Sequence, residues 1–130
     1  MPVLAPAVAT ATGVRSDLEL LQGVWTSVAG PKEARFLIAG HRFTFEFVGG
    51  DLYMGTFDLV PGKMDLHIEE GPSDHVGRFS RCIYQFDGGI LRWCPGRPGS
   101  GKRPAAFPDV ADSRYLSLVF RRAGRPGRNR

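Results

Sequence analysis

The sequence has few of the features that define membrane, disulfide-rich or helical proteins. No hydrophobic run approaches the about 18 residues of a membrane-spanning helix, so we expect no membrane span. Two cysteines among 130 residues are too few for a disulfide-rich scaffold. The 42% hydrophobic and 23% charged content is close to the globular average, which excludes disorder throughout the chain. The 17 glycines and 10 prolines indicate many turns and argue against a helical bundle.

The net charge of +4 comes from the end of the chain. Residues 121–130 hold five arginines and no acid, whereas the other 120 residues hold 12 Lys and Arg against 13 Asp and Glu. A nucleic-acid groove needs cations spread over one folded face, so we expect no specific nucleic-acid binding. Residues 123–130 are predicted to be a basic disordered tail, with non-specific attraction to phosphates or anionic lipids as the alternative.

Residues 1–15 are predicted to be a flexible leader before a single domain at residues 16–122. The apolar part of the leader follows no Lys or Arg, and Pro2 and Pro6 interrupt it, unlike a signal peptide. The sequence therefore predicts a cytoplasmic protein, with secretion as the alternative.

Residues of alternating polarity dominate the predicted domain, which is typical of β-strands. A helical turn at residues 16–21 precedes the strands, and the clearest strand has Phe43, Phe45 and Phe47 on one face. No helix of useful length is predicted after Gln22. The predicted strands span residues 24–29, 35–39, 42–48, 52–60, 63–70, 77–86, 90–94 and 114–122.

Tight turns join most of these strands, which favours an all-β, eight-stranded up-and-down antiparallel barrel with a short N-terminal helical turn. Closing the sheet removes exposed edges, and eight strands leave room for packed side chains or one small ligand. Cys82 and Cys94 flank the Asp87-Gly88-Gly89 turn and are expected on opposite faces of the hairpin. A disulfide between them is then geometrically unfavourable, and we predict two free thiols.

Gly23-Val24-Trp25 follows the helical turn at the start of the first strand. This motif resembles the opening of lipocalins and related calycin barrels. The resemblance implies a structural role, in which Trp25 closes the barrel floor and stacks on an arginine of the last strand, Arg121 or Arg122.

A longer ordered set of motifs extends through most of residues 17–122. The motifs are DLELLQGVW (17–25), GTF (55–57), MDL (64–66), EGP (70–72), IYQFDG (83–88), LRWC (91–94) and GKRP (101–104) with Phe107. This ordered set resembles the planctomycete-type lipocalin-like domain family, whose members have no established function. The resemblance implies a calycin-type barrel and supplies no catalytic residue.

Other chemical motifs in the sequence are incomplete. Residues 96–102 have the spacing of a phosphate-binding loop, but Arg103 replaces the required Ser or Thr and Pro104 disfavours the following helix. Asp65, His67 and Glu69 share a strand face about 7 Å apart and do not converge on a metal by themselves. We therefore expect no catalytic residue, metal or cofactor, and we expect Cys82 to be buried and inert.

The aromatic residues carry the functional hypothesis. A small apolar or amphipathic ligand would bind non-covalently inside the barrel, residues 95–112 would form a flexible lid, and a buried Tyr84 hydroxyl would bond to the ligand. The alternatives are a protein-interaction module with a solid core and, third, a small enzyme of the cyclase or isomerase type, for which no acid–base pair is identified. The predicted ligand-binding residues are Phe45, Phe47, Tyr53, Phe57, Tyr84, Phe86 and Trp93.

Overall fold

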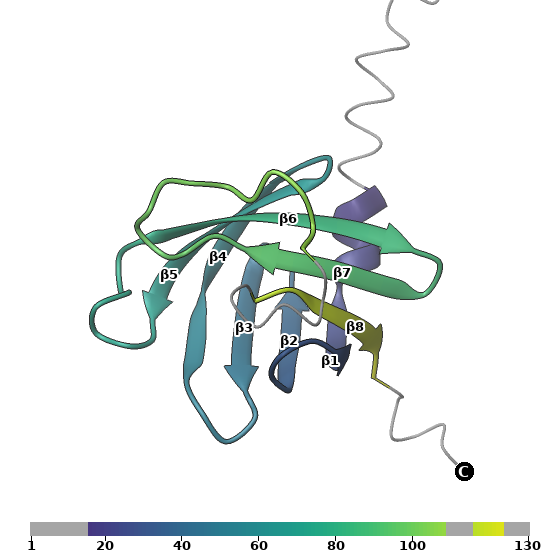
Figure 1. The fold of residues 1–130 in the computed structure, drawn as a ribbon, viewed down its shortest axis with the longest axis horizontal. Helices are drawn as coiled ribbons and strands as arrows, with labels where there is room; N and C mark the ends of the chain where they lie inside the picture. The colour runs from purple at the N-terminus through teal and green to yellow at the C-terminus, as the bar shows by residue number, and fades with distance from the viewer. Residues whose placement is uncertain (1–15, 109–115, 124–130) are drawn as a thin grey trace, which may run out of the picture.

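Eight antiparallel strands form one closed sheet after a short helical turn at residues 16–21 (Figure 1). The structure is a computed structural model and describes residues 16–108 and 116–123. Each strand pairs with its sequence neighbours, and β1 pairs with β8, which confirms the predicted up-and-down barrel. The strands are β1 (Gly23–Ala29), β2 (Ala34–Ala39), β3 (Arg42–Phe47), β4 (Leu52–Val60), β5 (Lys63–Glu70), β6 (Phe79–Asp87), β7 (Ile90–Pro95) and β8 (Leu118–Arg122).

Two predicted strands begin later than the sequence pattern indicates. Gly77 has φ +84° and donates its N–H to the Ile68 carbonyl within the β5–β6 loop, so β6 begins at Phe79 and not at Gly77. The last strand begins at Leu118, and the predicted start at Arg114 lies outside the described residues. The predicted leader at residues 1–15 and residues 124–130 of the predicted tail also lie outside them.

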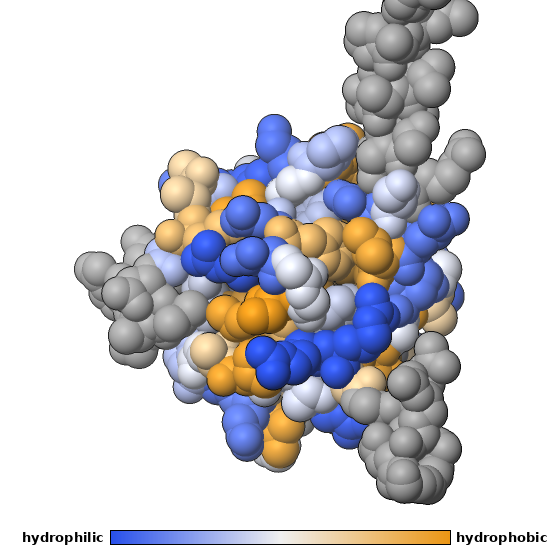
Figure 2. All heavy atoms as spheres, turned by 90° about the vertical axis from the view of Figure 1, so that its right-hand side faces the viewer, coloured by the Kyte–Doolittle hydropathy of each residue, from blue (hydrophilic) through white to orange (hydrophobic). Residues whose placement is uncertain are grey.

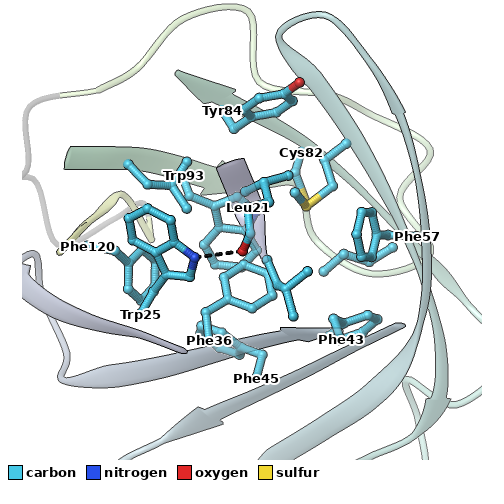
Figure 3. Close-up of a cluster of buried hydrophobic side chains, with 14 of the residues drawn as sticks. Leu21, Trp25, Phe36, Phe43, Phe45, Phe57, Cys82, Tyr84, Trp93 and Phe120 are labelled. Carbon is cyan, nitrogen blue, oxygen red and sulfur yellow. Dashed lines mark hydrogen bonds between the residues drawn. The ribbon is translucent and has the colours of Figure 1, made fainter. Parts of the chain in front are cut away.

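Inward-facing side chains fill the centre of the barrel. Phe36 of β2 is fully buried, and its ring centroid lies 4.9 Å from that of Trp93 on β7 and 5.8 Å from that of Phe120 on β8. Phe45 of β3 closes the same cluster at 5.4 Å from Phe36 (Figure 3). Burial of such aromatic side chains is the main favourable contribution to folding, because each removes a large apolar area from water.

Successive strands run in opposite directions, so the turns and loops that connect them divide between two ends of the barrel, called here the floor end and the mouth end. The floor end carries the helical turn, the β2–β3, β4–β5 and β6–β7 turns and the end of β8. The mouth end carries the β1–β2 and β3–β4 turns, the β5–β6 loop and the segment after β7. In Figure 1 the β6–β7 hairpin and the helical turn lie on the right, and the β5–β6 loop lies on the left.

Trp25 and Arg122 close the floor end. These residues are register partners on β1 and β8, and directly opposed residues point to the same side of a sheet. The Arg122 guanidinium carbon lies 4.3 Å from the Trp25 ring centroid, and its nitrogens donate to the carbonyls of Leu20 and Gln22. The Trp25 indole N–H donates to the Leu21 carbonyl at 2.8 Å (Figure 3). Arg122 therefore ties the helical turn to the last strand.

Gly23 makes room for this contact. Its φ is +119°, and a Cβ at this position would lie 3.0 Å from Nη1 of Arg122. A side chain would be strained by the backbone conformation and would also push the guanidinium away from its carbonyl acceptors. The glycine of the Gly-x-Trp motif is thus explained by the close approach of Arg122.

Hydrophobic side chains reach the surface in patches that charged side chains separate on the face shown in Figure 2. That face contains the helical turn, where Leu20 is half exposed. Among the described residues, no helix is long and apolar enough to span a membrane.

Replacing Arg122 should destabilise the barrel, whereas replacing Arg121 should not. Arg122→Ala removes the stacking on Trp25 and leaves two carbonyls of the helical turn without their donor, which should lower the free energy of unfolding by about 1–3 kcal/mol. Arg121→Ala removes the same charge from an exposed neighbouring residue and should change the free energy of unfolding by less than about 0.5 kcal/mol. Urea denaturation of both variants measures the difference, and equal losses would contradict this role for Arg122.

Candidate functional site

A small apolar pocket lies at the mouth end of the barrel and is called here the mouth pocket. Residues from β3 to β7 form its walls, and the segment after β7 forms its rim. Its volume is about 80 Å³, which is small beside the about 300–1,000 Å³ of pockets for drug-sized ligands. The lining residues are Phe43, Phe45, Phe47, Tyr53, Leu66, Ile68, Ser80, Trp93, Pro95, Gly96, Pro98 and Leu116.

The predicted ligand-binding residues divide between the two ends of the barrel. Phe45, Phe47, Tyr53 and Trp93 line the mouth pocket. The other three do not line it and lie toward the floor end. Phe57 packs 5.7 Å from the ring of His41 in the β2–β3 turn, and Phe86 packs 6.3 Å from the ring of Trp25. The core between these two groups is the cluster around Phe36.

The Tyr84 hydroxyl already has a protein partner. It donates to Oδ2 of Asp17 in the helical turn at 2.6 Å, so a bound ligand is not needed to satisfy it. Burial, together with this hydrogen bond to the carboxylate, raises the pKa of Tyr84 well above the usual value for a tyrosine. The sequence left this partner unidentified because Asp17 and Tyr84 are 67 residues apart.

Trp93, which lines the mouth pocket, has a buried indole N–H donor without a hydrogen-bond partner among the described residues. Its side chain is 2% exposed. Leaving a buried donor unpaired costs about 1–3 kcal/mol, so each such group requires an explanation. Trp25 shows the ordinary situation, since its indole N–H donates to Leu21.

The segment after β7 is tied to the barrel wall over its described part, residues 96–108. Gly96 donates to the Arg81 carbonyl at 2.7 Å, and Gly99 donates to the Phe79 carbonyl at 2.9 Å. Arg103 donates to the Cys82 carbonyl and lies 2.7 Å from Oδ1 of Asp65. This differs from the flexible lid that the glycine and proline content predicted; residues 109–112 of that prediction lie outside the described residues.

A broader hollow adjoins the mouth pocket and is called here the basic hollow. The two share Pro95, Gly96, Pro98 and Leu116. The basic hollow lies between the β5–β6 loop and the segment after β7, and its volume is about 1120 Å³. Its further lining residues are Asp74, His75, Arg78, Arg97, Ser100, Lys102, Arg103 and Pro104.

The incomplete motifs of the sequence have structural roles. Residues 96–102, whose spacing is that of a phosphate-binding loop, run along β6 without a following helix. Asp65 lies 3.0 Å from Arg81 as well as 2.7 Å from Arg103 and so links two arginines on the outer wall. Within the described part of the chain, no three His, Cys, Asp or Glu side chains are placed to hold a metal ion.

Cys82 and Cys94 are both buried free thiols. Cys82 belongs to the core cluster inside the barrel, whereas Cys94 is not part of that cluster. Burial away from water raises the pKa of the Cys82 thiol to about 12. A thiol that remains protonated at neutral pH is a poor nucleophile, which agrees with the inert packing role expected for Cys82.

The comparisons with known proteins supply no relative. No protein-family model matches the chain, and neither the curated proteins nor the solved structures include a significant match.

Cys82 should resist thiol reagents as long as the barrel is folded. In a Cys94→Ala variant at pH 8, we expect negligible reaction with the thiol reagent DTNB in buffer and complete reaction in denaturing urea, because only unfolding exposes the thiol and allows the thiolate to form. Fast reaction of the folded variant would contradict the buried position.

The same thiol should make stability depend on alkaline pH. The folded pKa is raised above the ordinary value of 9.0, so the unfolded chain loses this proton first as the pH rises. Above pH 9 the free energy of unfolding should therefore decrease, by at most about 1.4 kcal/mol per pH unit for this group. Relative to Cys94→Ala, the double variant Cys82→Ala/Cys94→Ala should show a smaller decrease in urea denaturation between pH 9 and 11.

Proposed function

We propose that this protein is a lipocalin-like barrel that binds a small apolar or amphipathic molecule in the mouth pocket. The proposal rests first on the apolar pocket itself, whose walls include Phe45, Phe47 and Trp93. The resemblance of the Gly-x-Trp motif and of the longer motif set to lipocalin-like domains supports the same assignment. Apolar walls with a few placed polar groups are typical of small-ligand sites.

The single observation that carries the proposal is that Trp93, a residue of the pocket wall, has a buried Nε1 without a hydrogen-bond partner among the described residues. A ligand oxygen that accepts a hydrogen bond from this indole would offset the about 1–3 kcal/mol lost by burying the donor. We therefore expect the ligand to carry an oxygen acceptor close to its apolar part. A pure hydrocarbon would leave the donor unsatisfied and should bind more weakly.

The volume of the mouth pocket limits the size of the part of the ligand that can enter it. About 80 Å³ accommodates a short alkyl chain or a single ring, but not a molecule that fills the whole barrel. The filled centre around Phe36 blocks deeper entry. The ligand should thus insert only its apolar end.

The filled centre also supports the second candidate function, a protein-interaction module with a solid core. Failure of every small probe to enter the mouth pocket would favour that candidate. The described residues that line the mouth pocket include one ionisable group, Tyr53, so the pocket offers no acid–base pair for an enzymatic role.

A neutral alcohol should bind beside Trp93 and leave Trp25 undisturbed. We expect titration of ¹⁵N-labelled protein with 1-hexanol to shift the Trp93 indole N–H resonance saturably, because the alcohol oxygen accepts from the free donor. The Trp25 indole resonance is an internal control, since its N–H already bonds to Leu21 at the other end of the barrel. Equal shifts of both resonances, or no shift of either, would contradict the proposal.

A pair of matched variants tests the location. Leu116→Phe replaces an aliphatic side chain at the rim of the mouth pocket by a larger aromatic one and should abolish the Trp93 shift. Leu59→Phe makes the same change at another half-buried position packed against the core, outside the pocket lining, and should leave the shift intact. An unchanged Trp25 resonance in both variants verifies the fold.

A further inference from the structure

We propose that the natural ligand of the mouth pocket is a single-chain amphiphile with an anionic head, a carboxylate or phosphate, and that the basic hollow binds this head. The inference rests on the proposed function and adds the charge of the ligand and the residues that recognise it. Arg78, Arg97 and Lys102 are the recognising side chains. The apolar end would lie in the mouth pocket and the head beyond the shared rim.

The charges of the basic hollow are strongly unequal. Among the described residues, four cationic side chains line it against one carboxylate, that of Asp74. Arg103 is already used, because its guanidinium forms an ion pair with Asp65 and donates a hydrogen bond to the Cys82 carbonyl. Arg78, Arg97 and Lys102 have no ion-pair partner within residues 16–108 and 116–123. Three cations that lack an ion-pair partner among the described residues, beside an apolar pocket, favour an anion over a neutral head group.

One hydrogen bond positions the Arg78 guanidinium, and its terminal N–H groups remain available to a ligand. Its Nε donates to the Asp74 carbonyl at 2.9 Å, which fixes the guanidinium beside the β5–β6 loop. The side chain also lies against Gly99, where φ is +82° and an added Cβ would be 2.8 Å from Nη1. Neither terminal nitrogen has a hydrogen-bond partner among the described residues. Such a positioned fork suits a carboxylate or phosphate, which can accept two parallel hydrogen bonds.

The opposite side of the basic hollow is anchored as well. The backbone from residue 96 to 103 is tied to β6 through Gly96, Gly99 and Arg103. Lys102 follows Ser100, whose hydroxyl accepts the Lys102 N–H at 3.1 Å. The cations on this segment are therefore presented by an ordered backbone, which reduces the entropy lost when an anion binds.

Tyr53 and His75 connect the two parts of the proposed site. Tyr53 lines the mouth pocket and His75 lines the basic hollow. The Tyr53 hydroxyl and Nδ1 of His75 are 3.0 Å apart, and the two rings are stacked at 5.8 Å. This contact fixes the β5–β6 loop, and with it Arg78, against the wall of the mouth pocket. The two surfaces thus form one continuous path for a chain and its head.

The experiment compares probes that share a six-carbon chain and differ in their heads: 1-hexanol, hexanoate and hexyl phosphate. Affinities are taken from the Trp93 indole shift at low ionic strength. At least one anion should bind about tenfold more tightly than the alcohol, and added salt should reduce this advantage because the cations are exposed. The stronger of the two anions identifies the head class.

Two double variants with equal charge changes locate the effect. Arg78→Gln/Lys102→Gln should reduce anion binding to the level of 1-hexanol and leave 1-hexanol binding unchanged. Arg121→Gln/Lys63→Gln removes the same charges from exposed sites at the floor end and should keep most of the anion advantage. Equal losses in both double variants would indicate a general charge effect and would overturn the proposed head site.

The outcomes separate this inference from the proposed function. If 1-hexanol binds and neither anion binds more tightly, the inference is wrong and the apolar site stands. If neither the alcohol nor the anions bind, the proposed function fails. Flotation with phosphatidylcholine vesicles containing phosphatidylglycerol tests a membrane surface instead. Vesicle binding without binding of any monomeric probe would overturn both proposals.

Discussion

The pairing of β1 with β8 is the constraint on which the rest of the structure depends. It converts a run of sequential hairpins into a closed barrel without exposed sheet edges. The register places Arg122 opposite Trp25, so the last strand is bound to the helical turn through one guanidinium. With the floor end closed in this way, the mouth pocket lies at the opposite end, between the strands and the segment after β7.

The filled centre of the barrel decides what kind of ligand site is available. Phe36 meets Trp93 and Phe120 across the interior, which separates the floor aromatics from the mouth aromatics. A hollow barrel would accommodate a ligand along its axis, whereas the apolar pocket at the mouth of this barrel has a volume of about 80 Å³. For the proposed ligand, specificity would then come from groups near the rim, where the loops rather than the strands supply the side chains.

The strands and the aromatic wall of the mouth pocket were predictable because they depend on local alternation, whereas the polar contacts around the pocket were not, because they join distant residues. The period of two placed Phe45, Phe47 and Trp93 inside the barrel, where they line the mouth pocket. The same pattern predicted that the Tyr84 hydroxyl contacts a ligand, because the sequence does not show that this hydroxyl donates to Asp17. Arg78 was missed because its place beside Gly99 arises from the packing of two loops.

Four arginines of the same chemistry have different functions here because their surroundings satisfy them differently. Arg122 is occupied by an indole ring and two carbonyls, and its role is stability. Arg103 and Arg81 both form ion pairs with Asp65, and Arg103 thereby fixes the segment after β7 on the outer wall. Arg78 is oriented by a single hydrogen bond from Nε, and its terminal nitrogens have no partner in residues 16–108 and 116–123. An arginine that is positioned but incompletely paired, beside an apolar pocket, is suited to recognise an anion that arrives from solution.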